Sequence, residues 1–212
     1  MNALAHPQVA FWNRIARKYA SDPIADEAGY EATLRRVQAL LHADQDVLEV
    51  GCGTGSTALR LAGGARRYHA TDVAPEMIAI AREKLQAHPV AQLQFEVADA
   101  CSPRGRSFDM LLAFNAVHLL PDLDASLAAM LRALKPGGLF ISKTACVGEM
   151  NPLITQLALP LARLIGKAPP VLLFKEAQLV AAFERQGLHL EAVERHGTRG
   201  KDIRVVIIAR KM

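Results

Sequence analysis

A short apolar segment that runs into three closely spaced glycines constrains the fold of this chain more than any other feature. Asp46–Val50 has the composition of a short buried strand, and Gly51, Gly53 and Gly55 follow it at alternate positions. Ser56–Ala62 then has the pattern of a helix. Glycine lets a backbone turn tightly and lets a ligand lie against its amide groups. The segment therefore predicts a strand, a turn and a helix that border a ligand-binding crevice.

Strand and helix patterns alternate along most of the remaining chain. Beyond the first strand, the predicted strands are Tyr68–Thr71, Leu93–Val97, Met110–Phe114, Leu139–Ser142, Leu188–Glu194 and Ile203–Arg210. The further predicted helices are Glu76–Ala87, Leu123–Leu134 and Lys175–Gln186. This alternation is typical of an α/β fold with a parallel or mixed sheet and helices on both of its faces.

Two segments lie outside the alternation. A length of 212 residues predicts a single domain over residues 1–212. Within residues 1–45, two helical patterns flank Ser21-Asp22-Pro23, and we interpret this part as an N-terminal helical cap. Residues 148–174 are apolar, contain Pro152, Pro160, Pro169 and Pro170, and interrupt the connection before the last helix. Long connections in compact domains are usually functional, so we interpret this insert as a lid.

Two acidic residues follow the next two predicted strands. Asp72 comes 21 residues after Gly51, where a carboxylate can accept the two hydroxyls of a ribose, and it can also cap the helix that begins near Pro75. Asp99 follows the third strand, where a carboxylate can accept the exocyclic amine of an adenine. The glycine spacing differs from the dinucleotide fingerprint, because Ser56 stands where that pattern has glycine. An NAD-type oxidoreductase is therefore disfavoured and remains an alternative.

Composition and charge exclude other classes. A hydrophobic content of 51% excludes a mainly disordered chain. The 25 Lys and Arg residues exceed the 21 Asp and Glu residues by a net charge of +4, and they are scattered, so we expect no nucleic-acid partner. The three cysteines lack metal-ligand spacing, so we expect no metal and a reduced, cytoplasmic setting. Met1–Trp12 lacks a signal-peptide pattern, and Leu153–Ile165 is too short for a membrane span.

Five segments, in order along nearly the whole chain, resemble the class I S-adenosylmethionine-dependent methyltransferases. They are Glu49–Gly55, Asp72–Met77, Ala98–Ala100, Phe108–Leu120 and Leu134–Gly138. The subgroup that the chain resembles acts on small molecules and quinones. The resemblance implies a Rossmann-like seven-stranded mixed sheet that ends in an antiparallel hairpin. It also implies S-adenosylmethionine as the cofactor.

The same resemblance assigns cofactor-binding roles to residues that match the family motifs. Gly51, Cys52 and Gly53 would approach the amino-acid part of the cofactor, and Asn115 would lie near its sulfonium. The ribose and adenine would be held by Asp72, Val73, Met77, Asp99 and Ala100. Glu49 belongs to the first motif. Cys52 is more consistent with a small buried residue than with a nucleophile.

Two residues are candidates for a catalytic role. His118 follows the fourth strand, where a neutral imidazole could take a proton from a nucleophile, or could simply pack there. Tyr19 lies in the aromatic N-terminal segment that folds over the cofactor in similar enzymes. It could contact the cofactor or substrate, or only pack in the cap.

The implied reaction is in-line methyl transfer to a small molecule, in which the protein aligns the reactants and excludes water. The apolar side chains of the insert suggest an apolar or aromatic acceptor. The alternatives are an RNA or protein methyltransferase, an NAD-type oxidoreductase, and a non-catalytic protein that binds S-adenosylmethionine. The sequence identifies neither the acceptor nor the oligomeric state.

Overall fold

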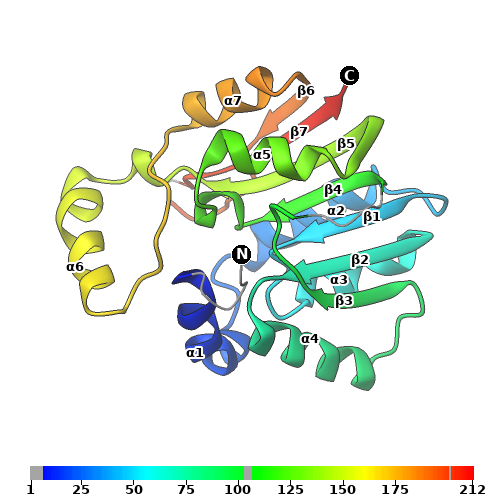
Figure 1. Ribbon diagram of the computed structural model, residues 1–212, viewed down its shortest axis with the longest axis horizontal. Helices are drawn as coiled ribbons and strands as arrows, with labels where there is room; N and C mark the ends of the chain where they lie inside the picture. The colour runs from blue at the N-terminus through cyan, green and yellow to red at the C-terminus, as the bar shows by residue number, and fades with distance from the viewer. Residues whose placement is uncertain (1–6, 103–106, 201) are drawn as a thin grey trace.

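The computed structural model describes residues 7–102, 107–200 and 202–212, and these residues form a layered structure around one seven-stranded sheet (Figure 1). The strands are β1 Asp46–Val50, β2 Arg67–Asp72, β3 Leu93–Val97, β4 Phe108–Phe114, β5 Leu134–Ala145, β6 Leu188–Glu194 and β7 Arg204–Lys211. Their order is β3-β2-β1-β4-β5-β7-β6, and β7 runs antiparallel to both of its neighbours. The predicted Rossmann-like mixed sheet with a terminal antiparallel hairpin is confirmed.

Helices cover both faces of this sheet, as the sequence predicts. Those described are α1 Pro7–Ser21, α2 Glu27–Gln38, α3 Ser56–Leu61, α4 Pro75–Ala87, α5 Leu123–Leu131, α6 Leu159–Leu164 and α7 Glu176–Arg185. One apolar core joins the sheet to α5 and α7 through Leu127 and Phe183. A second core joins the opposite face to α2, α3 and α4 through Leu34, Leu61 and Ile78. Short helical turns are η2 Ala62–Gly64, η3 Val117–Leu119, η4 Val147–Glu149 and η5 Ile154–Ala158.

The boundary between α5 and β5 differs from the sequence prediction. The predicted helix extends to Leu134, but α5 ends at Leu131 and Leu134 already pairs with Phe108 as the first residue of β5. The Pro136-Gly137-Gly138 turn lies inside β5, where the strand register shifts so that Leu139 pairs with Met110. Continuing the helical leucine pattern was wrong at this point, because pairing with β4 outweighs helical periodicity.

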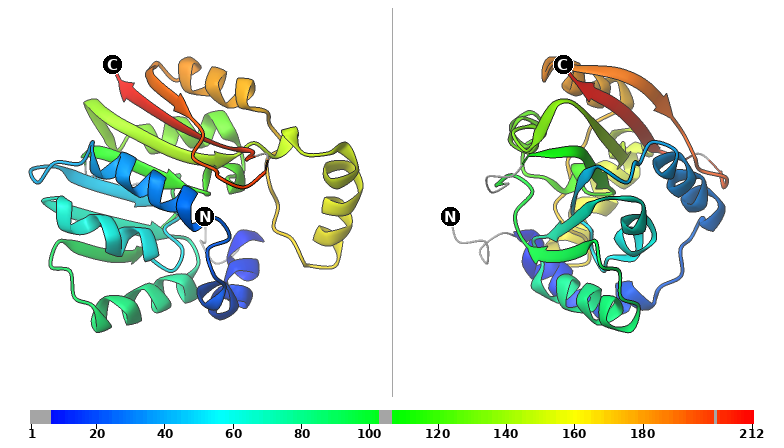
Figure 2. Two further views of the ribbon diagram at one scale, coloured as in Figure 1. Left: turned by 180° about the vertical axis from the view of Figure 1, so that it is seen from behind. Right: turned by 90° about the vertical axis from the view of Figure 1, so that its right-hand side faces the viewer.

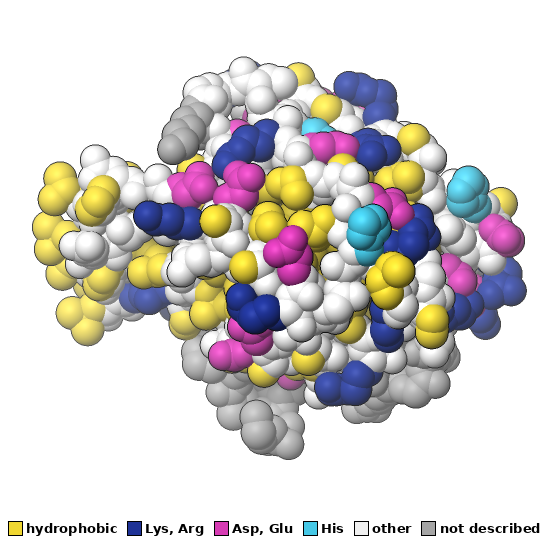
Figure 3. All heavy atoms as spheres, turned by 90° about the horizontal axis from the view of Figure 1, so that it is seen from above, with side chains coloured by type: hydrophobic (Ala, Val, Ile, Leu, Met, Phe, Trp, Pro, Cys, Tyr) yellow, Lys and Arg dark blue, Asp and Glu magenta, His cyan; other side chains and the backbone are white. Residues whose placement is uncertain are grey.

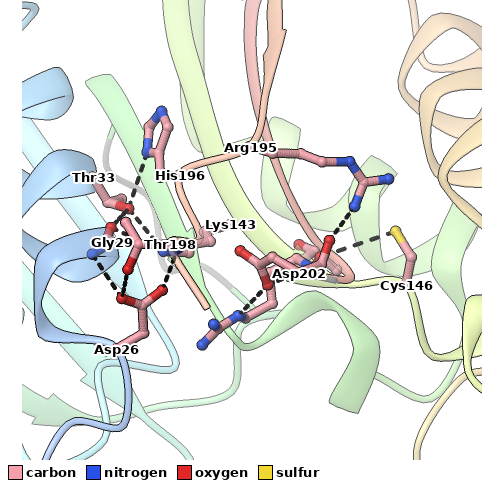
Figure 4. A network of polar contacts seen from close by, with 11 residues as sticks. Asp26, Gly29, Thr33, Lys143, Cys146, Arg195, His196, Thr198 and Asp202 are labelled. Carbon is pink, nitrogen blue, oxygen red and sulfur yellow. Dashed lines mark hydrogen bonds and ion pairs between the residues drawn. The ribbon is translucent and has the colours of Figure 1, made fainter. Parts of the chain in front are cut away.

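A buried polar network attaches α2 to the far end of β5 (Figure 4). The ammonium group of Lys143 on β5 is buried and donates to the hydroxyl of Thr33 on α2 at 2.8 Å. Burial lowers the pKa of this lysine. Asp26 accepts from the backbone of Gly29 at 3.1 Å and of Thr198 at 2.7 Å. Helix α2, the sheet and the loop between β6 and β7 are therefore held together by groups far apart in sequence.

Helix α1 packs across α4. Ala16 is 1% exposed and lies in a small apolar cluster with Met77 and Ile80 of α4. Arg17 also forms an ion pair with Glu83 at 2.6 Å. This contact places α1 beside the turns that follow the parallel strands. The two helices expected around residues 8–42 are thus confirmed as elements.

Residues 148–174 include η5 and α6, and they extend away from the sheet in both Figure 1 and Figure 2. No residue of η5 or α6 is buried. Within the described part of the chain, no helix has the length and apolar character needed to cross a membrane.

Candidate active site

A pocket of about 810 Å³, its open mouth included, lies where four parallel strands end. Small-ligand sites typically occupy roughly 300–1,000 Å³. The strands β1, β2, β3 and β4 end at Val50, Asp72, Val97 and Phe114. The pocket is lined by Gln8, Trp12, Tyr19, Gly51, Gly53, Asp72, Val73, Met77, Ala98, Asp99, Ala100, Phe114, Asn115, Ala116, Leu119, Leu120 and Pro121.

The glycine turn after β1 forms one wall of the pocket with bare backbone. Gly51 and Gly53 have φ values of +67° and +54°, in the left-handed region that glycine tolerates best. A Cβ on Gly51 would stand 2.6 Å from the Cβ of Ala116, so a side chain does not fit there. A Cβ on Gly53 would meet its nearest neighbour, the Tyr19 ring, at 3.9 Å. The turn therefore lets a ligand lie directly on the main chain.

Asp72 is fixed at the end of β2 by two backbone amides. Its two carboxylate oxygens accept from the N–H groups of Gly53 and Ala74, each at 2.9 Å. Burial raises the pKa of this carboxyl, while the backbone hydrogen bonds oppose the rise. Ala74, not Asp72, is the N-cap residue of α4, and no side chain caps that helix. Each carboxylate oxygen can accept more than one hydrogen bond, so Asp72 can still receive ligand hydroxyls.

An apolar slot with an acidic edge completes this side of the pocket. Val73 and Met77 lie on the β2 side, and Ala98, Asp99 and Ala100 lie after β3. The Asp99 carboxylate accepts from the amide of Cys101 at 2.8 Å, which fixes its position. A flat apolar ring with an amine on its edge fits such a slot, because the ring contacts apolar atoms and the amine reaches a carboxylate.

Asn115 follows β4 with a strained backbone. It is the one non-glycine residue with positive φ, +53°, in the part of the chain that the structure describes. Its N–H donates to the carbonyl of Lys143 at 2.7 Å, which ties it to the end of β5. Asparagine tolerates this conformation better than most residues, and strained residues of this kind cluster at binding sites. The geometry places Asn115 in the pocket wall, where the sequence motif predicts it.

Helix α1 supplies the outer wall of the pocket. Tyr19 and Trp12 contact each other edge to face, with ring centroids 5.7 Å apart. The pKa of Tyr19 is raised by burial and by the charge of Asp72. Gln8 donates to the carbonyls of Leu119 at 2.8 Å and Pro170 at 2.7 Å, and so links α1 to the loop after β4 and to the insert.

Two predicted cofactor residues, Glu49 and Cys52, lie outside the pocket lining. Glu49 on β1 is 1% exposed and accepts from the hydroxyl of Tyr68 at 2.6 Å. Burial raises the pKa of this carboxyl to about 7, and the charge of Asp72 adds to the rise. Burial also raises the pKa of the Cys52 thiol. Cys52 stands within the glycine turn, between Gly51 and Gly53, and has the surroundings of an unreactive thiol.

His118 also lies outside the lining, in the turn η3 between two lining residues. Its Nδ1 atom is buried and has no hydrogen-bond partner among the described residues. Burial lowers the pKa of its imidazole to about 4, so the ring is neutral at pH 7. Its carbonyl accepts from the amide of Leu172 at 2.7 Å. The role of His118 as a base stays a prediction.

The insert borders the pocket without lining it. No residue of 148–174 belongs to the lining, and the insert reaches the pocket walls through Pro170 and Leu172 at its base. Its role as a lid stays a prediction.

Sequence reasoning did not single out several lining residues. Ala98, Phe114 and Ala116 are chain neighbours of predicted residues, and Trp12 belongs to the aromatic N-terminal segment. The others are Gln8, Leu119, Leu120 and Pro121. Gln8 carries no local signal, because its partners are 111 and 162 residues away in the sequence.

Comparisons with known proteins agree with this geometry. Residues 47–138 match a family model described as a methyltransferase domain. The chain is 32% identical over 152 residues to ubiquinone biosynthesis O-methyltransferase of Xanthomonas axonopodis pv. citri (strain 306), a match covering 69% of this chain and 64% of that protein. It is 30% identical over 112 residues to malonyl-[acyl-carrier protein] O-methyltransferase of Serratia marcescens, covering 53% and 43%. The chain therefore spans less than two thirds of the length of each of these relatives.

The fold matches a solved methyltransferase over almost its whole length. N-methyltransferase NodS from Bradyrhizobium japonicum WM9, in complex with S-adenosyl-L-homocysteine, aligns with a TM-score of 0.74 and 17% identity. The alignment covers 97% of this chain and 99% of that one. The fold is therefore that of the class I S-adenosylmethionine-dependent methyltransferases. Within this fold, residues 47–138 are the part of the chain that matches the methyltransferase-domain model.

Proposed function

We propose that this protein transfers a methyl group from S-adenosylmethionine to a small apolar or aromatic molecule. One observation carries the proposal. A single pocket brings together the bare glycine turn, the backbone-fixed carboxylate of Asp72 and an apolar slot ending at Asp99. These three features match the amino-acid, ribose and adenine parts of this cofactor.

The residues that would hold the cofactor follow from this match. The main chain at Gly51 and Gly53 faces the amino-acid part, Asp72 accepts the ribose hydroxyls, and Asp99 accepts the adenine amine. Val73, Met77 and Ala100 line the apolar slot and would hold the adenine ring. Glu49 and Cys52 act indirectly, by supporting the turn. Tyr19 and Trp12 cover the ligand from α1.

The protein's own contribution to the reaction is alignment and the exclusion of water. When bound, S-adenosylmethionine supplies an activated methyl group that already carries its leaving group. Asn115 and Ala116 hold the pocket wall that follows β4, and α1 shields that wall from solvent. A hydroxyl or phenol acceptor would also need to lose its proton. His118 is neutral at pH 7 and is our candidate to receive it. Tyr19 is our second catalytic candidate, through direct contact with the cofactor or substrate.

The acceptor side of the pocket supports an apolar substrate. Phe114, Leu119, Leu120 and Pro121 line it without a charged group. Both curated relatives described above are O-methyltransferases, and one of them is named for ubiquinone biosynthesis. We infer that residues 1–212 act in the cytoplasm as a single methyltransferase domain, in which α1 belongs to the cap and the base of residues 148–174 lies beside the pocket. The three cysteines are free, in agreement with a reduced setting.

Calorimetric titration separates this proposal from its alternatives. We expect S-adenosylhomocysteine to bind and NAD to give no heat, and binding of NAD alone would overturn the proposal. Incubating the protein with labelled S-adenosylmethionine and a metabolite extract, followed by mass spectrometry, should then reveal a methylated small molecule. Methylation only of RNA or protein in matched extracts, or of nothing, would contradict the proposed substrate class.

A further inference from the structure

The insert presents a large apolar surface that nothing in the described chain covers. We use the name arm for residues 150–175, whose helix runs through η5 into α6. Six aliphatic side chains of the arm between residues 153 and 165 are exposed by 42% to 84%: Leu153, Ile154, Leu157, Leu161, Leu164 and Ile165. Figure 3 shows hydrophobic side chains gathered on the protruding end of the molecule that the arm forms. Contiguous apolar surfaces of this kind mark interaction sites.

The exposed side chains share one side of the arm helix. Their spacing of one, four, eight, eleven and twelve residues from Leu153 follows the helical period. The other side of the helix is held by the returning chain, where Arg163 donates to the carbonyls of Pro169 at 3.2 Å and Val171 at 2.7 Å. The apolar side is therefore the outer side, turned away from the arm's own return segment.

The arm and its neighbour α1 carry only positive charge. Residues 150–175 contain Arg163, Lys167 and Lys175 and no Asp or Glu. Helix α1 contains Arg14, Arg17 and Lys18 and likewise no acid. The guanidinium of Arg14 donates to the carbonyl of Gly166 at the tip of the arm, so the two basic segments are in contact. Arg14 and Lys167 therefore place positive charge at the tip of the arm, whereas Arg17 and Lys18 are paired with Glu83 and Asp22.

We propose that the arm docks on the surface of a lipid bilayer with anionic headgroups, its outer side embedded among the acyl chains. Helices that lie in the interface combine an apolar face with Lys and Arg beside it, and they bind by buried apolar area together with attraction to anionic lipid. The arm has both features. The helix lies along the interface and does not cross the bilayer, consistent with its length.

Charge and side-chain type favour lipid over other occupants. A two-fold contact between two arms would bring together two segments that contain Lys and Arg but no acidic residue. A protein partner is usually anchored by Trp, Tyr or Arg in the centre of the interface, whereas the outer side of the arm offers only Leu and Ile. Acyl chains need no such anchors, and anionic headgroups neutralise the flanking cations.

Docking in this way would bring the pocket close to the bilayer. The base of the arm contacts the pocket wall through the carbonyl of Pro170, which accepts from the lining residue Gln8. An apolar acceptor concentrates in a bilayer, so this arrangement would deliver it near the pocket mouth. The docking proposal itself goes beyond the proposed function and does not depend on it, because lipid binding requires neither cofactor nor acceptor.

Vesicle co-sedimentation of the full chain tests the proposal. The vesicles contain about 30% phosphatidylglycerol in phosphatidylcholine, with pure phosphatidylcholine as the neutral comparison. We expect the wild type to sediment with the anionic vesicles and much less with neutral ones, and raised salt to weaken the binding. Leu164→Glu should lower the affinity by about tenfold or more. Ile24→Glu, a matched control at a side chain that is 50% exposed outside the arm, should leave it within about twofold.

Thermal unfolding of both variants checks that they fold, which is expected because both side chains are exposed. Absence of wild-type binding to the anionic vesicles, or equal binding by Leu164→Glu, would overturn the proposal. Light scattering without lipid should show the 23.0 kDa monomer. A species of twice this mass that Leu164→Glu dissociates would instead identify a second copy as the occupant. Co-purification with an acidic protein that abolishes vesicle binding would likewise overturn the proposal that the arm docks on lipid.

Discussion

Helix α1 and the arm are neighbours with similar composition and opposite surroundings. Both are apolar and basic, and neither contains an acidic residue. Yet α1 buries Ala16 against α4 and presents Tyr19 and Trp12 to the pocket, whereas no residue of the arm helix segments η5 and α6 is buried. Two segments of similar composition can therefore differ in burial, because the burial of each depends on the elements it packs against.

This comparison separates two kinds of function. The apolar side of α1 packs against other parts of the protein, so α1 can act as a cover for a ligand held by the strand ends. The apolar side of the arm is not buried by the described chain, so the arm is suited to bind an external surface. Substitutions in the pocket, in α1 and in the arm should therefore affect different measurements.

The largest effect is expected at the pocket floor, with Asp72→Ala. The change leaves the N–H groups of Gly53 and Ala74 without their acceptor and removes the acceptor for the ribose hydroxyls. Affinity for S-adenosylhomocysteine should fall by about a thousandfold or more, measured by calorimetry. Asp44→Ala, at an exposed loop acid, is the control and should bind normally. Unchanged binding by Asp72→Ala would remove Asp72 from the site.

The second effect concerns the buried floor beneath the pocket. The pKa of Glu49 is raised from 4.5 to about 7 in the folded protein, so its ionisation as the pH rises costs stability. The folded state should lose about 3 kcal/mol between pH 4.5 and pH 7 to 8 through this residue. Glu49→Gln, which keeps an acceptor for Tyr68, should abolish that loss in urea unfolding at several pH values. If the free energy of unfolding varies with pH in the same way for both proteins, the pKa of Glu49 is not raised in the folded state.

The third effect tests whether α1 covers the ligand. Trp12→Ala removes a lining side chain and the edge contact with Tyr19. Affinity for S-adenosylhomocysteine should fall by about tenfold, because apolar contact and shielding from water are lost. Phe11→Ala is a matched control, since Phe11 also contacts Trp12 but does not line the pocket. If both variants bind like the wild type, α1 is not a cover.

The smallest effect on the pocket should come from the arm. Leu164 is 84% exposed, so Leu164→Glu should change the free energy of unfolding by no more than about 0.5 kcal/mol. The dissociation constant of S-adenosylhomocysteine should also stay unchanged, whereas the KM for an apolar acceptor should rise. Turnover assays with the identified acceptor measure the KM, and calorimetry measures the dissociation constant of S-adenosylhomocysteine. A loss of cofactor affinity would instead place the arm over the cofactor.

Much of the fold and part of the site were predictable because they rest on local patterns. The glycine turn, Asp72 and Asp99 each follow an apolar strand, and parallel strands bring their carboxyl ends to one edge. These residues needed only the correct order of strands to come together, and the sheet has that order. Asn115, by contrast, was predicted only through the resemblance to a known family.

The rest depends on contacts between distant parts of the chain. Gln8 reaches the pocket through carbonyls 111 and 162 residues away, and the buried Lys143 donates to Thr33, 110 residues away. The end of α5 was misplaced because Leu134 continues a leucine pattern but pairs with Phe108 in the sheet. Local periodicity carries no information about these partners.

Hydrogen–deuterium exchange with and without S-adenosylhomocysteine tests the division between cover and arm most directly. We expect the ligand to slow exchange in residues 8–20 and in the turns around residues 51–55 and 72–77, and to leave residues 153–165 unchanged. Protection of residues 153–165 without protection of residues 8–20 would contradict it, because the arm would then be the cover.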